Sequence, residues 1–253
     1  MSTATSVSPG HRDPALLGQT VVVIGGSAGI GLATARHARA EGAGVILTGR
    51  NPDRLRSAAT DVGALSTAAF DANDPAQLKQ FFQELTKPVD HVMVTAGHPS
   101  YGRLLEMDPD QARRAVSGHL VLALEVARNA VGKVRPGGTL LFMGGTGGRR
   151  IRPDLGLAPA ATAALPALTA GLALELAPVR VNLIAAGFVD TPLSAGLLGD
   201  GLDARREELR ATLPIGRVVG PDDVAALAVH IMTNTALTGA TYDVDGGQQF
   251  VDA

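Results

Sequence analysis

Residues 20–31 read Thr-Val-Val-Val-Ile-Gly-Gly-Ser-Ala-Gly-Ile-Gly, an apolar run that ends in a glycine-rich turn. The segment that follows, at 30–41, has the apolar spacing of a helix. Glycines at such a strand-to-helix turn permit a tight bend and let a phosphate approach the backbone, where the helix N-terminus offers free N–H groups. The turn therefore predicts the first unit of an α/β domain and a site for a dinucleotide.

The rest of the chain repeats this alternation of strand and helix. Runs rich in Val, Ile and Leu predict strands at Thr20–Ile24, Gly44–Thr48, Leu65–Phe70, His91–Thr95, Thr139–Met143, Arg180–Ile184 and Thr241–Val244. Helical spacing predicts helices at Ile30–Glu41, Pro52–Thr60, Pro75–Thr86, Asp108–Val134, Ala158–Ala177 and Pro221–Met232. The strands are nearly continuous in apolar residues, which is typical of strands buried on both faces. We therefore expect a doubly wound parallel sheet of about seven strands, a Rossmann fold, in a single domain.

Two segments fall outside this alternation. Residues 1–13 are polar, so we expect a disordered tail before a dinucleotide-binding domain at 14–253. The segment at 185–220 carries glycines, prolines and a short charged helix at Asp203–Ala211. It predicts a lid-like insertion near 187–220, although a simple surface excursion is the alternative.

Composition excludes several classes of function. The 253 residues carry a formal net charge of −2 and no basic stripe, which argues against nucleic acid or a membrane surface as partner. The chain has no cysteine, so disulfides and thiolate metal sites are excluded, and we expect no metal site. The sequence contains no secretory signal pattern and no apolar run long enough to span a bilayer, so we expect a cytoplasmic protein.

The end of the second predicted strand bears on the choice of dinucleotide. A carboxylate there would accept hydrogen bonds from a ribose 2′-hydroxyl and favour NAD. This chain instead reads Leu-Thr-Gly-Arg-Asn at 47–51. The Arg50 guanidinium can pair with a 2′-phosphate, so NADP(H) is favoured, with a solvated arginine as the alternative.

Beyond the glycine turn, short motifs recur in a fixed order along residues 18–250. With these motifs the sequence resembles the short-chain dehydrogenase/reductase family. The motifs are Gly25-xxx-Gly29-x-Gly31, Asp71, Thr95-Ala96-Gly97, Leu172–Ala177, Val181-Asn182, Gly187–Pro192, Gly216-Arg217, Pro221-x-Asp223-Val224-Ala225 and Asp245-Gly246-Gly247.

The resemblance implies roles for residues on both halves of a cofactor site. It implies that Asp71 and Ala72 flank the adenine, that Ala96 and Gly97 line the adenosine ribose, and that the carboxamide of a nicotinamide is held by Val189 and Thr191. Together with the turn, the cofactor-binding residues that we predict are Gly25, Ser27, Ala28, Gly29, Ile30, Gly31, Arg50, Asp71, Ala72, Ala96, Gly97, Val189 and Thr191.

The catalytic residues that the resemblance implies are missing. Typical members use an Asn, Ser, Tyr and Lys tetrad, and alignment through Gly138–Gly148 and Leu172–Ala177 places these roles on Ser117, Gly145, Ala158 and Thr162. Tyr101 and Tyr242 are the only tyrosines, and no lysine follows Lys133. A shifted alignment therefore cannot supply the usual tyrosine and lysine pair, and carbonyl reduction by the usual mechanism is not expected.

Other side chains near the carboxyl ends of the predicted strands could donate the proton in place of the tetrad. His98 and Tyr101 follow the Thr95-Ala96-Gly97 motif, and His119 lies two residues after Ser117. Histidine is a competent acid near neutral pH. The alternatives are that His119 is an interior helix residue and that Tyr101 anchors a loop. The arginines at 149–152 could clamp an anionic substrate, or they could be solvated or pair with a partner subunit.

These features lead to one main hypothesis and one alternative. The main hypothesis is an NADP(H)-dependent oxidoreductase of this family that acts on a small molecule through a non-standard proton-donor site. The alternative is a catalytically inactive NADP(H)-binding sensor or partner subunit. The predicted helices at Asp108–Val134 and Ala158–Ala177 are rich in Ala and Leu around their circumference, so we expect a homodimer or homotetramer.

Overall fold

A seven-stranded parallel sheet forms the centre of the computed structural model, which describes residues 13–97, 99, 101–149 and 151–251. The strand order is β3-β2-β1-β4-β5-β6-β7, as predicted for a Rossmann fold. The strands are β1 (Thr20–Ile24), β2 (Gly44–Gly49), β3 (Ser66–Ala69), β4 (Val89–Val94), β5 (Val134–Gly145), β6 (Arg180–Ala186) and β7 (Thr241–Val244). The predicted disordered tail at 1–13 lies outside the described residues, apart from Asp13.

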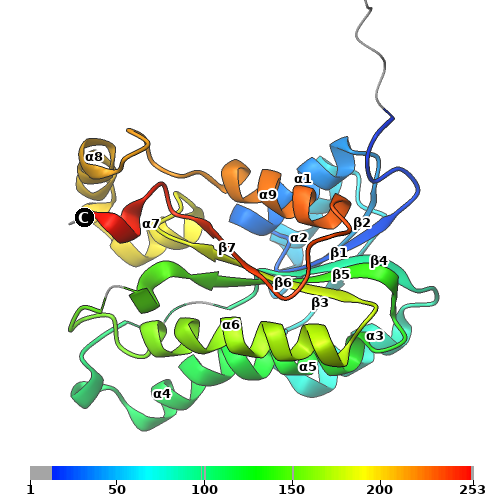
Figure 1. The fold of residues 1–253 in the computed structure, drawn as a ribbon, viewed down its shortest axis with the longest axis horizontal. Helices are drawn as coiled ribbons and strands as arrows, with labels where there is room; N and C mark the ends of the chain where they lie inside the picture. The colour runs from blue at the N-terminus through cyan, green and yellow to red at the C-terminus, as the bar shows by residue number, and fades with distance from the viewer. Residues whose placement is uncertain (1–12, 98, 100, 150, 252–253) are drawn as a thin grey trace, which may run out of the picture.

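Helices cover both faces of this sheet (Figure 1). One face packs on α1 (Gly29–Ala40), α2 (Pro52–Val62) and α9 (Pro221–Thr233), and the other lies toward α3 (Pro75–Glu84), α4 (Pro109–Val116), α5 (Leu122–Ala130) and α6 (Ala158–Glu175). Each face has its own buried cluster of Val, Leu, Ile and Ala. Prolines at the first turn begin α2, α3, α4 and α9, because proline suits a position where the N–H has no helical partner.

The predicted single helix at Asp108–Val134 is wrong in two respects. One turn of π-helix at Ser117–Val121 separates α4 from α5. The helix also ends at Ala130, since Gly132 adopts a left-handed φ of +70°, and Val134 already belongs to β5. The helical hydrogen bonding therefore changes within this turn, while the residues that flank it, Val116 and Leu122, keep α-helical backbone angles.

The two outermost strands also differ from the prediction that strands are buried on both faces. In β3 and β7 none of the residues is fully buried, whereas β1, β4 and β6 are almost entirely buried. The sheet order explains this, because β3 and β7 are its edges and each has a neighbour on one side alone.

A buried arginine at the start of β6 fixes α9 against the sheet. The Arg180 guanidinium donates to the Ile231 and Met232 carbonyls at 2.8 Å each, and to three further carbonyls between 3.0 and 3.2 Å. Carbonyls in the last turn of a helix lack helical partners and carry partial negative charge. Arg180 therefore supplies hydrogen bonds and a positive charge to the carbonyl groups at the C-terminal end of α9.

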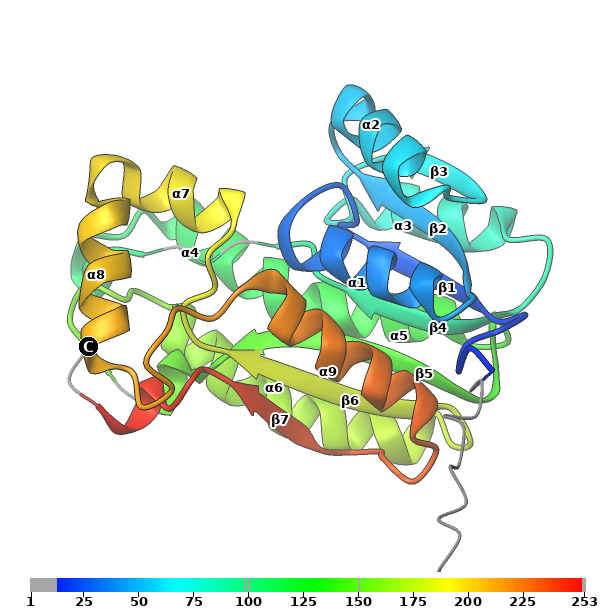
Figure 2. The same ribbon diagram turned by 90° about the horizontal axis from the view of Figure 1, so that it is seen from above.

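Two short helices, α7 (Pro192–Leu198) and α8 (Leu202–Thr212), lie beyond the carboxyl ends of the strands (Figure 2). They belong to the segment that we predicted as a lid. The helix predicted at Asp203–Ala211 corresponds to α8, whereas α7 was not predicted, because its Pro-Leu-Ser-Ala-Gly-Leu-Leu sequence has no helical charge pattern. Across the described part of the chain, the helices are too short or too polar to traverse a lipid bilayer.

A buried histidine on β4 makes the fold sensitive to acid. His91 Nε2 lies 2.7 Å from Gln19 Oε1, while its buried Nδ1 has no hydrogen-bond partner among the described residues. Burial lowers the pKa of His91 to about 4, Asp90 acts in the opposite direction, and Arg180 lowers it further. The folded state therefore holds the neutral ring, and protonation favours the unfolded chain.

We predict that this histidine contributes about 3 kcal/mol of stability above pH 6.5, and that the contribution is lost as the pH falls from 6.5 to about 4. His91→Gln keeps an amide donor for Gln19 and removes the titrating ring, so its unfolding free energy should fall less steeply over this interval. Urea denaturation at a series of pH values measures this. An identical pH dependence in His91→Gln would contradict the prediction.

Candidate functional site

The glycine turn after β1 is built by a close approach of backbone to backbone. A Cβ at Gly31 would lie 2.4 Å from the Gly25 carbonyl oxygen, and a Cβ at Gly25 would lie 2.7 Å from the Ala96 amide nitrogen. Gly25 also has a φ of +98°, which an L side chain rarely adopts. Thr95 Oγ1 donates to the Gly25 carbonyl at 3.0 Å. Glycine is therefore required at both positions, and the turn is tied to the loop after β4.

The N-terminus of α1 opens from this turn. Its N-cap residue, Ala28, makes no capping hydrogen bond from its side chain, and the first turn of the helix contains no acidic residue. The uncapped N–H groups and the helix dipole together suit an anion. A Cβ on Gly29 would lie 3.4 Å from Thr191, which brings the loop after β6 to the same place. The cradle fits a pyrophosphate group, as a dinucleotide would require.

The residues predicted to hold the adenosine half lie at the ends of β2 and β3. Gly49 packs against Ser27, since a Cβ on Gly49 would lie 3.1 Å from Ser27 Oγ, and Arg50 follows directly as an exposed residue. Asp71 Oδ1 accepts a hydrogen bond from the Asn73 amide at 3.0 Å, and the neighbouring Ala72 is buried. Ser27, Arg50, Asp71 and Ala72 do not line the main cavity of the described residues.

A cavity of about 630 Å³ extends from the glycine turn along the carboxyl edge of the sheet. Nine of the predicted cofactor residues line it, namely Gly25, Ala28, Gly29, Ile30, Gly31, Ala96, Gly97, Val189 and Thr191. It is also lined by the candidate catalytic residues Tyr101 and His119, and by three of the four positions assigned to the tetrad, which are Gly145, Ala158 and Thr162. At the fourth position, Ser117, the neighbouring Gly118 and His119 contribute to the lining instead.

The tetrad positions in this cavity offer no acid. Gly145 has no side chain, and a Cβ built there would meet Thr162 Cγ2 at 3.4 Å, so the two positions are adjacent. Thr162 lies one turn after Ala158 on α6, and its hydroxyl is 2.9 Å from the Ala158 carbonyl and 3.1 Å from that of Pro159. Because a carbonyl accepts, the Thr162 proton is directed back into its own helix.

His119 and Tyr101 reach the same cavity from two elements. His119 Nδ1 lies 3.2 Å from the Ala115 carbonyl, which can only accept, so Nδ1 carries the proton in this contact. Its Nε2 is then the atom that remains for other partners. Tyr101 is half-exposed, and burial raises the pKa of its hydroxyl, which keeps it protonated. The third candidate, His98, lies outside the described residues.

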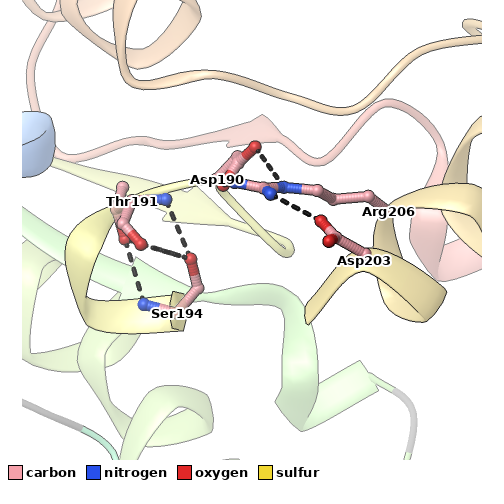
Figure 3. A network of polar contacts seen from close by, with 5 residues as sticks. All are labelled: Asp190, Thr191, Ser194, Asp203 and Arg206. Atoms are coloured by element: carbon pink, nitrogen blue, oxygen red, sulfur yellow. Dashed lines mark hydrogen bonds and ion pairs between the residues drawn. The ribbon is translucent and has the colours of Figure 1, made fainter. Parts of the chain in front are cut away.

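The segment at 187–220, which we predicted as a lid, is held at its base by an arginine clamp. Arg206 on α8 donates through Nε and a terminal nitrogen to the two carboxylate oxygens of Asp190, both at 2.8 Å, and also to Asp203 at 2.8 Å (Figure 3). Asp190 immediately precedes Thr191, which begins α7 in a capping box with Ser194. A bridge between Val189 and Val219 closes the two ends of the segment. The clamp therefore holds α8 onto the loop that touches the glycine turn.

The C-terminal segment supports the same loop. Gln248 Oε1 accepts a hydrogen bond from the Phe188 amide at 2.7 Å, and both Gln248 and Gln249 line the cavity. Arg149 forms a two-pronged ion pair with Asp243 on β7 and donates to Gln249 Oε1 at 2.7 Å. This hydrogen bonding lowers the pKa of the Asp243 carboxyl. Arg149 is thus paired within the chain, Arg152 lines the cavity, and Arg150 lies outside the described residues.

Several residues that line the cavity were not predicted from the sequence. They are Leu155, Phe188, Leu193, Leu197, Leu198, Arg205, Gln248 and Gln249. The leucines of the predicted lid, in a stretch free of charge, were a signal that could have been used. No local pattern marks Gln248 or Arg205, since each reaches the cavity through contacts between distant segments. In the described part of the chain, no three His, Asp or Glu residues gather as a metal site would require.

Comparison with known proteins agrees with this geometry. A family model described as enoyl-(acyl carrier protein) reductase matches residues 25–249. The short-chain dehydrogenase/reductase ATR9 of Stachybotrys chlorohalonatus is 30% identical, over 92% of this chain and 98% of its own. An NADP-dependent (R)-specific alcohol dehydrogenase of Lentilactobacillus kefiri is also 30% identical, over 92% of this chain and 97% of its own. The chain belongs to the short-chain dehydrogenase/reductase family.

Solved structures give the same fold. BdcA in complex with NADPH superposes with a TM-score of 0.82 at 26% identity, covering 92% of this chain and 95% of its own. A small-chain dehydrogenase in complex with NADPH has a TM-score of 0.79 at 28% identity, covering 91% of this chain and 98% of its own. The chain is thus similar to oxidoreductases along almost its whole length.

We predict that the arginine clamp controls the mobility of the lid segment. Arg206→Gln removes the two-pronged bond to Asp190, so amide hydrogen exchange in residues 187–213 should become roughly tenfold faster. Exchange in β1 and β4 should stay as in the original protein. Asp203→Asn is the matched control, because it weakens the exposed arm of the clamp and leaves the Asp190 pair intact. Equal exchange in Arg206→Gln and Asp203→Asn would contradict the role of Asp190.

Proposed function

We propose that this protein is an NADP(H)-dependent oxidoreductase that delivers the substrate proton from a site other than the usual tetrad. One observation carries the proposal. A continuous cavity joins the glycine turn and the N-terminus of α1 to His119 and Tyr101. A bound dinucleotide and a side chain able to donate a proton would therefore face the same space. The oxidoreductases among its relatives support the general class of reaction.

The choice of NADP(H) over NAD(H) rests on the end of β2. Arg50 stands there as an exposed cation, beside Gly49 and Ser27, where a carboxylate would be needed to bind a ribose 2′-hydroxyl. A guanidinium pairs well with a phosphate through parallel hydrogen bonds. The relative from Lentilactobacillus kefiri is named as NADP-dependent, and two structural neighbours contain NADPH, which supports the same choice.

In this proposal the chain's own residues divide the work between binding and proton transfer. When bound, the nicotinamide supplies the hydride. Val189 and Thr191, on the loop after β6, position the carboxamide edge, while Ala96 and Gly97 line the adenosine ribose. We assign the proton to the doubly protonated ring of His119, which keeps its Nδ1–H on the Ala115 carbonyl and gives the Nε2 proton to a substrate oxygen. Tyr101 contributes a hydrogen bond and an aromatic wall.

A second candidate function, an NADP(H) sensor or partner subunit without catalysis, is favoured by the tetrad positions. Gly145 and Ala158 carry no polar group, and the Thr162 hydroxyl is bonded to its own helix. A site of this kind can bind a dinucleotide without activating a carbonyl. The sensor should bind NADP⁺ and NADPH with unequal affinity or release a partner in response to one of them.

We also propose that the chain forms a homodimer or homotetramer acting on a small-molecule substrate. Apolar side chains such as Val121 and Leu174, on the α5 and α6 side of the molecule, are 44% and 83% exposed. Such positions usually pack on another subunit in closed symmetric oligomers.

The role of Arg50 gives the first test of the cofactor assignment. Arg50→Glu places a carboxylate where a 2′-phosphate would lie, so NADPH affinity should fall about 100-fold while NADH affinity is unchanged or improved. Fluorescence titration of both cofactors measures this. Arg54→Glu, on the neighbouring turn of α2, makes the same charge change and should alter NADPH affinity by less than about threefold. Equal losses in the two variants would contradict the assignment.

The proton-donor assignment is tested by turnover. NADPH oxidation should occur with at least one member of a panel of carbonyl, enone and imine compounds. His119→Gln should lower kcat by about 10²–10⁴-fold with unchanged NADPH affinity, and Tyr101→Phe should lower it much less. Full activity in His119→Gln would overturn the assignment to His119. NADPH binding without hydride transfer to any compound would favour the sensor instead.

A further inference from the structure

The lid helix α7 presents an apolar surface to the cavity. Leu193, Leu197 and Leu198 line the cavity, and they remain 46%, 47% and 38% exposed. The helix contains no charged residue, and the one residue that it buries is Ser194. Leaving three leucines in water is unfavourable by roughly 25 cal/mol for each Å² of apolar surface. These leucines therefore form a wall that an apolar ligand would cover.

A second apolar part of the cavity lining comes from the loops after β4 and β5. The Gly102 amide donates to the Asp154 carbonyl at 2.8 Å, and a parallel bridge joins Gly102 to Leu155. This bridge brings Tyr101 and Leu155 together on the cavity lining. Phe188 adds a third apolar side chain, supported by the small cluster of Leu209 and Leu213 on the lid side. These aromatic and aliphatic side chains thus line the same cavity as the α7 leucines.

The positions assigned to the tetrad enlarge the space between these walls. Gly145 and Ala158 line the cavity where a serine and a tyrosine would stand in a typical family member. A tyrosine ring at the Ala158 position would occupy part of this volume. Its absence leaves room for a substrate with a bulky body next to the expected nicotinamide position.

The charges on the cavity lining are of one sign. Among the described lining residues there is no Asp or Glu, whereas Arg152 and Arg205 both contribute. Arg205 sits on α8 with its side chain 20% exposed, and one terminal nitrogen forms an ion pair with Glu208, whose Oε2 lies 2.6 Å away and which is not part of the lining. A guanidinium has five N–H donors, so this bond uses a fraction of its capacity. The lining favours an anionic group and disfavours a cation.

We propose that the cavity selects an amphipathic anion, a substrate with a bulky apolar body and one carboxylate or similar group. The apolar body lies between the α7 leucines and the Tyr101–Leu155 wall, and the anionic group lies at Arg205 on the lid. This inference names the substrate class of the oxidoreductase proposed above and rests on that function. Binding of the amphipathic anion itself, however, requires no turnover.

The test is isothermal titration calorimetry of the full chain with decanoate, decan-1-ol and decylammonium, with and without saturating NADP⁺. Decanoate should bind at least tenfold more tightly than decylammonium. Leu197→Gln should weaken decanoate binding about tenfold, because part of the apolar contact is lost. Arg205→Gln should weaken decanoate binding about fivefold and leave decan-1-ol binding unchanged. Leu193→Gln serves as a second wall variant if Leu197→Gln does not fold.

Two matched controls lie outside the cavity. Leu65→Gln replaces a leucine that is 67% exposed, and Arg210→Gln removes another arginine of α8, so neither should change decanoate affinity. If decanoate does not bind while NADP⁺ does, the inference is wrong and the oxidoreductase proposal stands. If decanoate binds and NADP⁺ does not, the oxidoreductase proposal fails instead. Equal decanoate affinity in Leu197→Gln, together with a changed mass by light scattering, would make the leucines a subunit interface and overturn the inference.

Discussion

The close approach of the Gly31 backbone to the Gly25 carbonyl is the constraint on which the site depends. No side chain fits between them, and Thr95 bonds the same carbonyl from the loop after β4. Strand β1, helix α1 and the β4 loop are therefore held at one point, at the place where the strand order reverses between β1 and β4. Ligands of open α/β sheets bind at such a reversal, because the loops on its two sides diverge and leave a crevice.

The other walls of the cavity depend on contacts between other segments of the chain. Arg206 holds α8 onto Asp190, Gln248 supports Phe188, and the Gly102–Leu155 bridge brings two loops together. Each contact joins residues well separated in the chain, and each acts on a loop at the carboxyl edge of the sheet. The glycine turn contributes mainly backbone to the cavity, and the rest of the lining is assembled from side chains carried by loops and by α6, α7 and α8.

The lining of the cavity also bears on the absence of the usual tetrad from this sequence. Glycine and alanine at positions 145 and 158 leave space in place of proton donors, and the Thr162 hydroxyl is turned into its own helix. In the function that we propose, the proton comes from a group on another element, and the turn of π-helix at Ser117–Val121 contributes His119 to the cavity lining. The same small residues also widen the cavity. Glycine and alanine at these two positions therefore account both for the absence of the tetrad side chains and for the room that a bulky ligand would need.

The sequence by itself determined the fold and the position of the glycine turn after β1. Glycine spacing, buried strand runs and helix-starting prolines are local signals, and they located β1, α1 and the order of the elements correctly. It could not locate the break in the helix at 117–121, the exposure of the edge strands β3 and β7, or helix α7. Tertiary structure decided these features and the contacts of Arg206, Gln248 and Arg205. Each of them depends on which separate segments of the chain pack together, and the spacing of residues along the sequence does not specify this packing.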